Sequence, residues 1–155
     1  MKHFLILIFL LLMLSIVSCD PRKVTDEFHS LKGSTWNADS LQTFQFPVFR
    51  KDQYHNIYFN VRNDRSYPFS NLWLFVAIEN PVGETRKDTI QLILADPSGN
   101  WLGKGFSGIY THRALYMQNV YFPDPGNYSI RIGHGMRPSL LKGITDIGIR
   151  VEKIN

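Results

Sequence analysis

The stretch HNIYFNVRN, residues 55–63, alternates apolar side chains with polar or half-polar ones along its whole length. This period of two is typical of a strand in an antiparallel sheet that buries one face. The same period recurs in YSIRI, residues 128–132, and in IGIRV, residues 147–151. The sequence therefore predicts a sheet of half-buried strands.

A second kind of strand is expected at LWLFVAI, residues 72–78, where every side chain is apolar. A helix is the alternative. The run is short, rich in aromatic residues and bounded on both sides by turn-forming residues, which favours a strand. Its uniform apolar character predicts a central strand covered on both faces.

Further strands are expected at residues 42–49, 89–94 and 115–122, and Pro47 places the first at a sheet edge because proline has no N–H to donate. About seven or eight short strands without a convincing helix predict an all-β fold, an antiparallel β-sandwich or jelly roll. The apolar phase of these strands predicts a core of Ile57, Phe59, Val61, Leu72, Leu74, Ile130, Ile132, Ile147 and Ile149.

The N-terminus has the pattern of an export signal. Lys2 precedes an apolar run at residues 4–17, which is shorter than the roughly 20 residues of a membrane-spanning helix. Residues 1–18 are therefore expected to be a signal peptide. Residues 16–19, Ile-Val-Ser-Cys, resemble a bacterial lipobox, whose cysteine takes a diacylglycerol thioether; an ordinary signal peptide with a chance cysteine is the alternative. We expect Cys19 to be the lipidation site.

The mature chain is expected to contain a lipidated N-terminal tether at residues 19–37 and one β-sandwich domain at residues 38–155. The tether segment is polar, and a short helix at residues 26–31 is the alternative to an irregular chain. Cys19 is the single cysteine, so no disulfide is expected. Removing Lys2 from 17 basic residues leaves 16 against 13 acidic ones, spread without a cluster, which disfavours nucleic-acid binding.

A glycine-rich stretch, ADPSGNWLGKGFSGIY at residues 95–110, matches the dinucleotide pattern G-x-G-x-x-G letter for letter. A dinucleotide site needs a helix directly after the glycines, whereas IYTHRALYMQNVYF predicts a strand. The spacing from Gly99 to Gly103 is one residue too short for a phosphate loop. We therefore expect Gly99 to close a turn after Pro97, and the other glycines to permit bulges or close backbone contact.

Two interpretations stay open for the large side chains of this stretch. In the first, Trp101 and Phe106 fill the core, and this is the interpretation we favour for the two aromatic side chains. In the other, Trp101, Lys104 and Phe106 form the edge of a partner-docking surface, because a glycine-rich loop can present large side chains to solvent.

Other chemistry is sparse. His29, His55, His112 and His134 are scattered without ligand spacing, so neither a metal site nor a cofactor nor catalytic residues are predicted. The segments Asp39-Ser40-Leu41 and Asp88-Thr89-Ile90 resemble a D-[ST]-aliphatic sequon for O-glycosylation of exported bacterial proteins. If they are used, Ser40 and Thr89 must face solvent, with Thr89 at the start of a strand.

Four segments behind the lipobox together resemble one family. YPFSNLWLFV, the glycine-rich stretch, PDPGNYSIRI and MRPSLLKGITDIGIRVE are similar to the GldH gliding-motility lipoproteins of Bacteroidota. The resemblance implies a non-enzymatic cell-envelope lipoprotein, anchored in the membrane by its lipid and associated with the gliding apparatus and the linked type IX secretion machinery. Cys19 is the residue whose role carries over.

The resemblance leaves open how such a protein acts. Docking on a larger envelope assembly is the leading hypothesis, an envelope glycan-binding module is the alternative suggested by the aromatic content, and a hydrolase is the third. The segment CDPRK lacks the run of acidic residues that resembles a surface-export signal in this phylum. We therefore expect the domain to face the periplasm.

Overall fold

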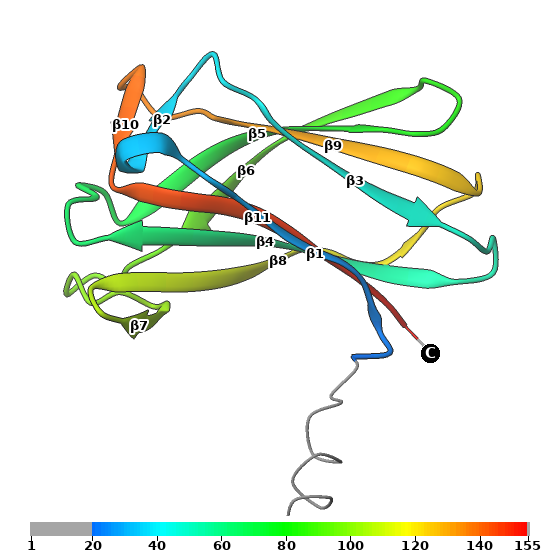
Figure 1. Cartoon of the computed structure of the whole chain (residues 1–155), viewed down its shortest axis with the longest axis horizontal. Coiled ribbons are helices and arrows are strands. Elements are labelled where there is room, and N and C mark those ends of the chain that lie inside the picture. Colours follow the sequence, from blue (N-terminus) through cyan, green and yellow to red (C-terminus); the bar gives the residue numbers. More distant parts are fainter. Residues whose placement is uncertain (1–19, 155) are drawn as a thin grey trace, which may run out of the picture.

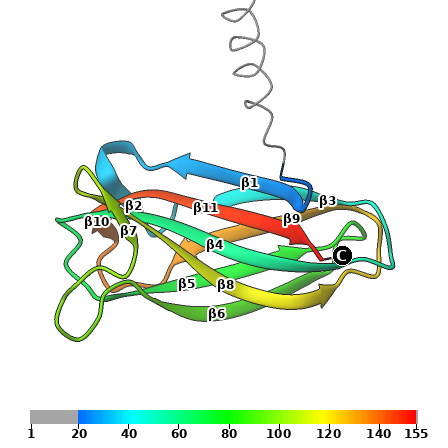
Figure 2. The same ribbon diagram turned by 90° about the horizontal axis from the view of Figure 1, so that it is seen from below.

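Two antiparallel sheets face each other in the computed structural model, which describes residues 20–154 (Figures 1 and 2). The larger sheet contains, in spatial order, β1 (Lys23–Ser30), β11 (Ile144–Lys153), β4 (Tyr54–Asp64), β8 (Ile109–Tyr121) and β7 (Lys104–Phe106). The smaller sheet contains β3 (Gln42–Val48), β9 (Gly126–His134), β5 (Asn71–Glu79) and β6 (Thr85–Ile93). The remaining elements are the 3₁₀ turn η1 (Lys32–Ser34) and the pair β2 (Thr35–Asn37) and β10 (Leu140–Lys142).

The predicted β-sandwich is confirmed, and so is its core. All nine residues predicted for the core are fully buried between the two sheets, at 0% exposure. They pack with aromatic side chains that include Trp36, Phe44 and Phe46. Each such side chain contributes roughly 1.5 to 3 kcal/mol through burial.

The strand count differs from the expected seven or eight. The described part of the chain forms eleven strands, because β2, β7 and β10 have three residues each and are too short to show a period in the sequence. Pro47 lies in β3, which pairs with β9 at the edge of the smaller sheet, as predicted. Within residues 20–154, no helix is long and apolar enough to cross a membrane.

The prediction that residues 72–78 form a strand is confirmed, but the prediction that both faces are covered is wrong. β5 lies between β9 and β6. Its side chains alternate between buried and exposed, and Trp73 and Phe75 are 39% and 55% exposed on the outer face. The run is apolar in both phases because the outer face also carries large apolar side chains.

The predicted tether at residues 19–37 is wrong for the part that the structure describes, and so is its helical alternative. β1 pairs along its length with β11, and Leu31 donates a backbone hydrogen bond to Thr145. The segment looks like a tether in the sequence because its outward side chains are polar. These side chains bind other polar groups of the sheet: Ser30 Oγ donates to Asp146 Oδ1 at 2.6 Å, for example.

Arg150 is the centre of the contacts that hold β1. Its side chain is 9% exposed, and its guanidinium donates to Asp26 at 2.7 Å, to Glu152 at 2.5 Å and to Asp20. Burial lowers the pKa of Arg150, but these hydrogen bonds outweigh burial and raise it above its ordinary value. Asn60, fully buried in β4, donates to Asp26 at 3.2 Å. The network therefore joins β1 to β11 and β4.

We predict that Asp26→Ala lowers the free energy of unfolding by about 1 to 3 kcal/mol, because it leaves part of the buried Arg150 and Asn60 hydrogen-bonding capacity unsatisfied. Urea unfolding measures the change. Asp52→Ala is the control, since Asp52 pairs with Arg50 on the surface, where both side chains are about 70% exposed; it is expected to change stability little. Equal effects of the two substitutions would contradict the role of the network.

Two histidines lie inside the sandwich. His55 packs against Phe122, and a ring nitrogen of His134 lies 3.1 Å from the carbonyl oxygen of Trp36. Burial lowers the pKa of both imidazoles below their ordinary value of 6.5, and it lowers that of half-buried His112. Each therefore remains neutral in the fold at a pH where it would be protonated in the unfolded chain.

The lower pKa of these histidines in the folded protein than in the unfolded chain predicts a loss of stability in mild acid. Below about pH 6.5 the unfolded chain binds more protons than the fold, so the free energy of unfolding decreases by at most about 1.4 kcal/mol per pH unit for each histidine. Urea unfolding at pH 7.5 and 5.5 measures the decrease, and His55→Phe should reduce it. A free energy of unfolding that stays constant between pH 7.5 and 5.5 would contradict the lowered pKa of these histidines.

Candidate functional site

The glycine-rich stretch begins with a tight turn built around Asp96. Gly99 has a positive φ of 84° and donates its backbone N–H to the carbonyl oxygen of Asp96 at 3.0 Å. The Asp96 carboxylate accepts from Ser98 N at 2.9 Å and Asn100 N at 2.8 Å. Hydrogen bonds from the Asn100 side chain and backbone lower the pKa of Asp96. The predicted role of Gly99 is confirmed.

The other glycines serve the backbone as well. A Cβ atom on Gly103 would lie 2.8 Å from the backbone carbonyl of Thr111, so a larger residue would push β7 away from β8. Gly108, with a φ of 83°, lies in the turn that joins these two strands. The segment after the glycines forms β8 and not a helix. The structure therefore supports the structural interpretation of these glycines.

The structure separates the three predicted docking residues. Trp101 is half-buried and packs on the core, with ring centroids 6.3 Å from Tyr67 and 5.7 Å from Tyr110. Phe106 is 86% exposed and Lys104 is also exposed, both on β7. The core interpretation is therefore wrong for Phe106. β7 lies at the end of the molecule opposite the start of β1 (Figure 1).

An apolar surface that the sequence analysis did not identify lies on the outer face of the smaller sheet. Leu41, Trp73 and Phe75, here named the aromatic face, are exposed there. Gly133 and Gly135 leave room for them: a Cβ atom would lie 2.8 Å from Leu41 and 3.0 Å from the Phe75 ring. The signal in the sequence was the second apolar phase of LWLFVAI.

Polar groups surround the aromatic face. A shallow hollow of about 530 Å³ runs beside Phe75 and is bordered by Lys87, Thr89 and Arg131. Thr89 is exposed and lies opposite Phe75 in the middle of β6, not at the start of a strand. Ser40 is exposed as well. Both residues are therefore exposed to solvent, as the predicted modification requires.

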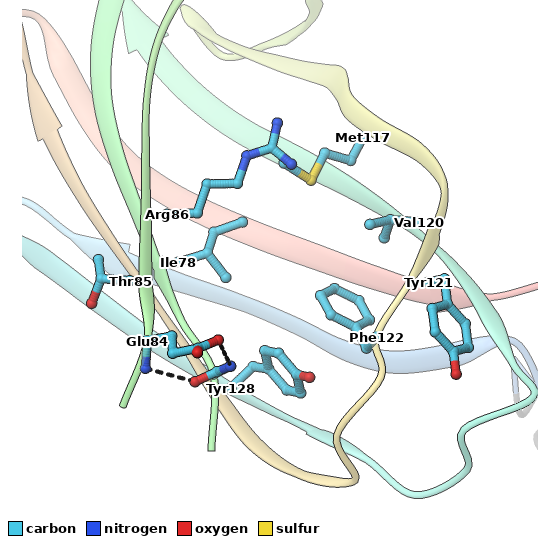
Figure 3. A pocket seen from close by; sticks show the side chains of 10 residues that line it. Ile78, Glu84, Thr85, Arg86, Met117, Val120, Tyr121, Phe122 and Tyr128 are labelled. Carbon is cyan, nitrogen blue, oxygen red and sulfur yellow. Dashed lines mark hydrogen bonds between the residues drawn. The ribbon is translucent and has the colours of Figure 1, made fainter. Parts of the chain in front are cut away.

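A smaller pocket of about 310 Å³ opens where β6 and the end of β8 lie apart without pairing (Figure 3). Ile78, Phe122 and Tyr128 form its apolar wall, while Arg86 and Met117 point toward one another across it. Burial raises the pKa of Tyr128. Asn80 and Glu84 line it as well, so the pocket combines apolar and polar groups.

Residues 20–154 contain no group of three or more His, Cys, Asp or Glu side chains that could hold a metal ion together. His29 lies 3.2 Å from Glu27 and from Gln42, far from the buried His55 and His134 in the chain. Cys19, the predicted lipidation site, lies outside the described residues. What the described surface offers is exposed apolar side chains for contact.

A solved structure and two proteins are similar to this chain. The crystal structure of the infectious bursal disease virus VP2 subviral particle matches with a TM-score of 0.39 and 14% identity, over 90% of this chain and 35% of that chain. The gliding motility lipoprotein GldH of Flavobacterium johnsoniae is 39% identical over 94% of both chains. The GldH homolog of Christiangramia forsetii is 34% identical over 97% of this chain and 96% of its own.

The sequence profile of the GldH lipoprotein family matches residues 23–151, from the first strand to the last. This range covers nearly all of the described structure, and the resemblance noted in the sequence is confirmed. The chain belongs to the GldH lipoprotein family.

Proposed function

We propose that this protein is a non-enzymatic, lipid-anchored component of the gliding-motility apparatus and the linked type IX secretion machinery, which acts by docking on an envelope protein. The similar Flavobacterium protein is named a gliding motility lipoprotein, and the match covers 94% of both chains. Membership in a lipoprotein family makes the chain a membrane-anchored protein of the cell envelope. The periplasmic side, the docking mode and the secretion link are parts of the proposal.

The anchor is proposed at Cys19, after removal of residues 1–18. Three residues separate this cysteine from β1, which starts at Lys23. One acyl chain gives marginal membrane binding, whereas the several chains of a mature lipoprotein hold the protein firmly. The start of β1 therefore fixes which end of the sandwich lies near the membrane.

The observation that carries the docking proposal is the exposure of Phe106 at the opposite end. β7 lies away from the start of β1 (Figure 1), and its residues Phe106, 86% exposed, and Lys104 are exposed to solvent. Leu102, 53% exposed, precedes them on the same hairpin. Large aromatic side chains such as phenylalanine are enriched at protein interfaces. A partner could reach this end while the lipid holds the other.

Glycan binding is the second candidate function, and the aromatic face favours it. Trp73 and Phe75 lie exposed on a sheet beside Lys87, Thr89 and Arg131, so that apolar rings and hydrogen-bonding groups are combined on one surface. Tryptophan presents a rigid ring with a polar edge. Loss of binding to a peptidoglycan or glycan array in Trp73→Ala would favour this function.

Lipid attachment is tested by metabolic labelling. We predict that radiolabelled palmitate enters the native protein and not Cys19→Ala, because the thioether-bearing residue is then missing. Label retained by the variant would contradict the anchor.

The intact mass of the native protein tests the proposed glycosylation of Ser40 and Thr89. If either residue carries a glycan, the mass exceeds that of peptide and lipid together; the exposure of both residues permits this modification.

The docking surface is tested by pull-down after crosslinking in native membranes. Phe106→Ala and Lys104→Glu are expected to reduce recovery of the partner at an unchanged melting temperature, because both side chains are exposed. Trp101→Ala is expected to lower stability by about 2 kcal/mol or more, since a half-buried ring leaves a cavity. Trp73→Ala is the matched aromatic control. Partner loss in Trp73→Ala with normal recovery in Phe106→Ala would place the docking site elsewhere.

A further inference from the structure

The end of the sandwich where β1 starts also carries the C-terminal end of β11, the loop between β3 and β4, and the loop between β8 and β9 (Figure 1). Backbone hydrogen bonds join these segments. Lys153 donates to the carbonyl of Arg22 at 2.8 Å, and Ile154 donates to that of Tyr54 at 2.8 Å. Tyr54 in turn pairs with Tyr121 at the end of β8. The segments therefore form one continuous surface.

Three large aromatic side chains are exposed on this surface. Phe49, in the loop after β3, is 80% exposed. Tyr54 and Tyr121 are about half exposed, and their ring centroids lie 6.1 Å apart. Tyrosine is enriched where one end of a side chain meets an apolar phase and the other meets water, as at a membrane interface.

The charge of the same surface is basic. The carboxylates of Asp20 and Glu152 bind Arg150, and that of Asp52 binds Arg50. In the described part of the chain, four basic side chains at this end form no ion pair. Among residues 20–154, the acidic side chains here that pair with no cation are half-buried Asp124 and exposed Glu84, in the turn between β5 and β6. The four basic residues are Arg22, Lys23, Lys51 and Lys153. Such cations attract the headgroups of anionic lipids.

The distance to the anchor is short. Lys23 is four residues beyond Cys19, so their Cα atoms can lie no more than about 14 Å apart. The body of the domain continues from Lys23 as a paired strand, so this stretch cannot lengthen without breaking β1 away from β11. A lipid on Cys19 would therefore hold this end of the sandwich close to the headgroups.

We propose that this end of the sandwich lies against the surface of an anionic lipid bilayer, and we name it the bilayer-facing end. Its contact residues are Arg22, Phe49, Lys51, Tyr54, Tyr121 and Lys153. The proposal rests on the lipid anchor proposed above and adds an orientation to it: the domain stands on the membrane through its own side chains, with β7 pointing away.

The single cysteine makes a direct test practicable. Because the Cys19 thiol is consumed in the thioether, a cysteine introduced elsewhere is the one reactive thiol of the mature lipidated protein. Phe49→Cys and Leu102→Cys are each labelled with an environment-sensitive fluorophore and reconstituted in vesicles of phosphatidylethanolamine with phosphatidylglycerol. Leu102, on the hairpin before β7, is the matched exposed control.

The label at residue 49 is expected to show blue-shifted emission, several-fold brighter than in detergent-free buffer, while the label at residue 102 reports water. Equal aqueous emission from both positions, on protein that floats with the vesicles, would overturn the bilayer contact and leave the anchor intact. Protein that fails to float lacks the anchor itself, which would overturn both proposals.

The electrostatic contribution is tested in the same background. Arg22→Glu combined with Lys51→Glu is expected to return the residue 49 label toward aqueous emission on these vesicles, and the melting temperature verifies that the fold is retained. Omitting phosphatidylglycerol should weaken the blue shift of the unaltered protein. A blue shift that stays the same after the double substitution and after omission of phosphatidylglycerol would overturn recognition of anionic headgroups.

Discussion

The contact between Arg150 and the carboxylates around it holds β1, the strand next to the proposed lipid anchor, on the larger sheet. Arg150 lies in β11, is almost buried, and binds Asp26 of β1 together with Asp20 and Glu152. A buried guanidinium without such partners would be costly, so the contact strongly favours a docked β1. The first strand therefore belongs to the larger sheet. With the lipid on Cys19, as proposed, the anchor lies within a few residues of this sheet, and the orientation of the domain would follow from its fold.

Much of the fold could be predicted from the sequence because a strand with one buried face has a regular pattern. All nine predicted core residues are buried, since each lies in the apolar phase of a period-two run. β5 was harder to interpret, because Trp73 and Phe75 are apolar without being covered. β1 was missed because its outward polar side chains, such as Asp26, find partners on strands that are distant in the chain. Partners so distant in the chain leave no pattern in the sequence of β1 itself.

The candidate site was predictable only in part for the same reason. The turn at Gly99 and the strand after the glycines follow from local chemistry, and both were recognised. Whether Trp101 or Phe106 faces the core depends on the path of β7, a strand of three residues with no period of its own. The aromatic face depends on glycines in the neighbouring segment, and the bilayer-facing end brings together residues from four parts of the chain. These features arise from tertiary packing.

The central claim, that the chain enters the sheet directly after its anchor, is tested most directly by amide hydrogen exchange of the mature protein. The β1 amides that donate to β11 are expected to exchange slowly, at rates that approach those of β11 itself, because opening them requires the Arg150 contacts to break. Exchange of residues 23–30 at the rate of an unstructured peptide, with β11 still protected, would contradict the account and restore a flexible tether between lipid and domain.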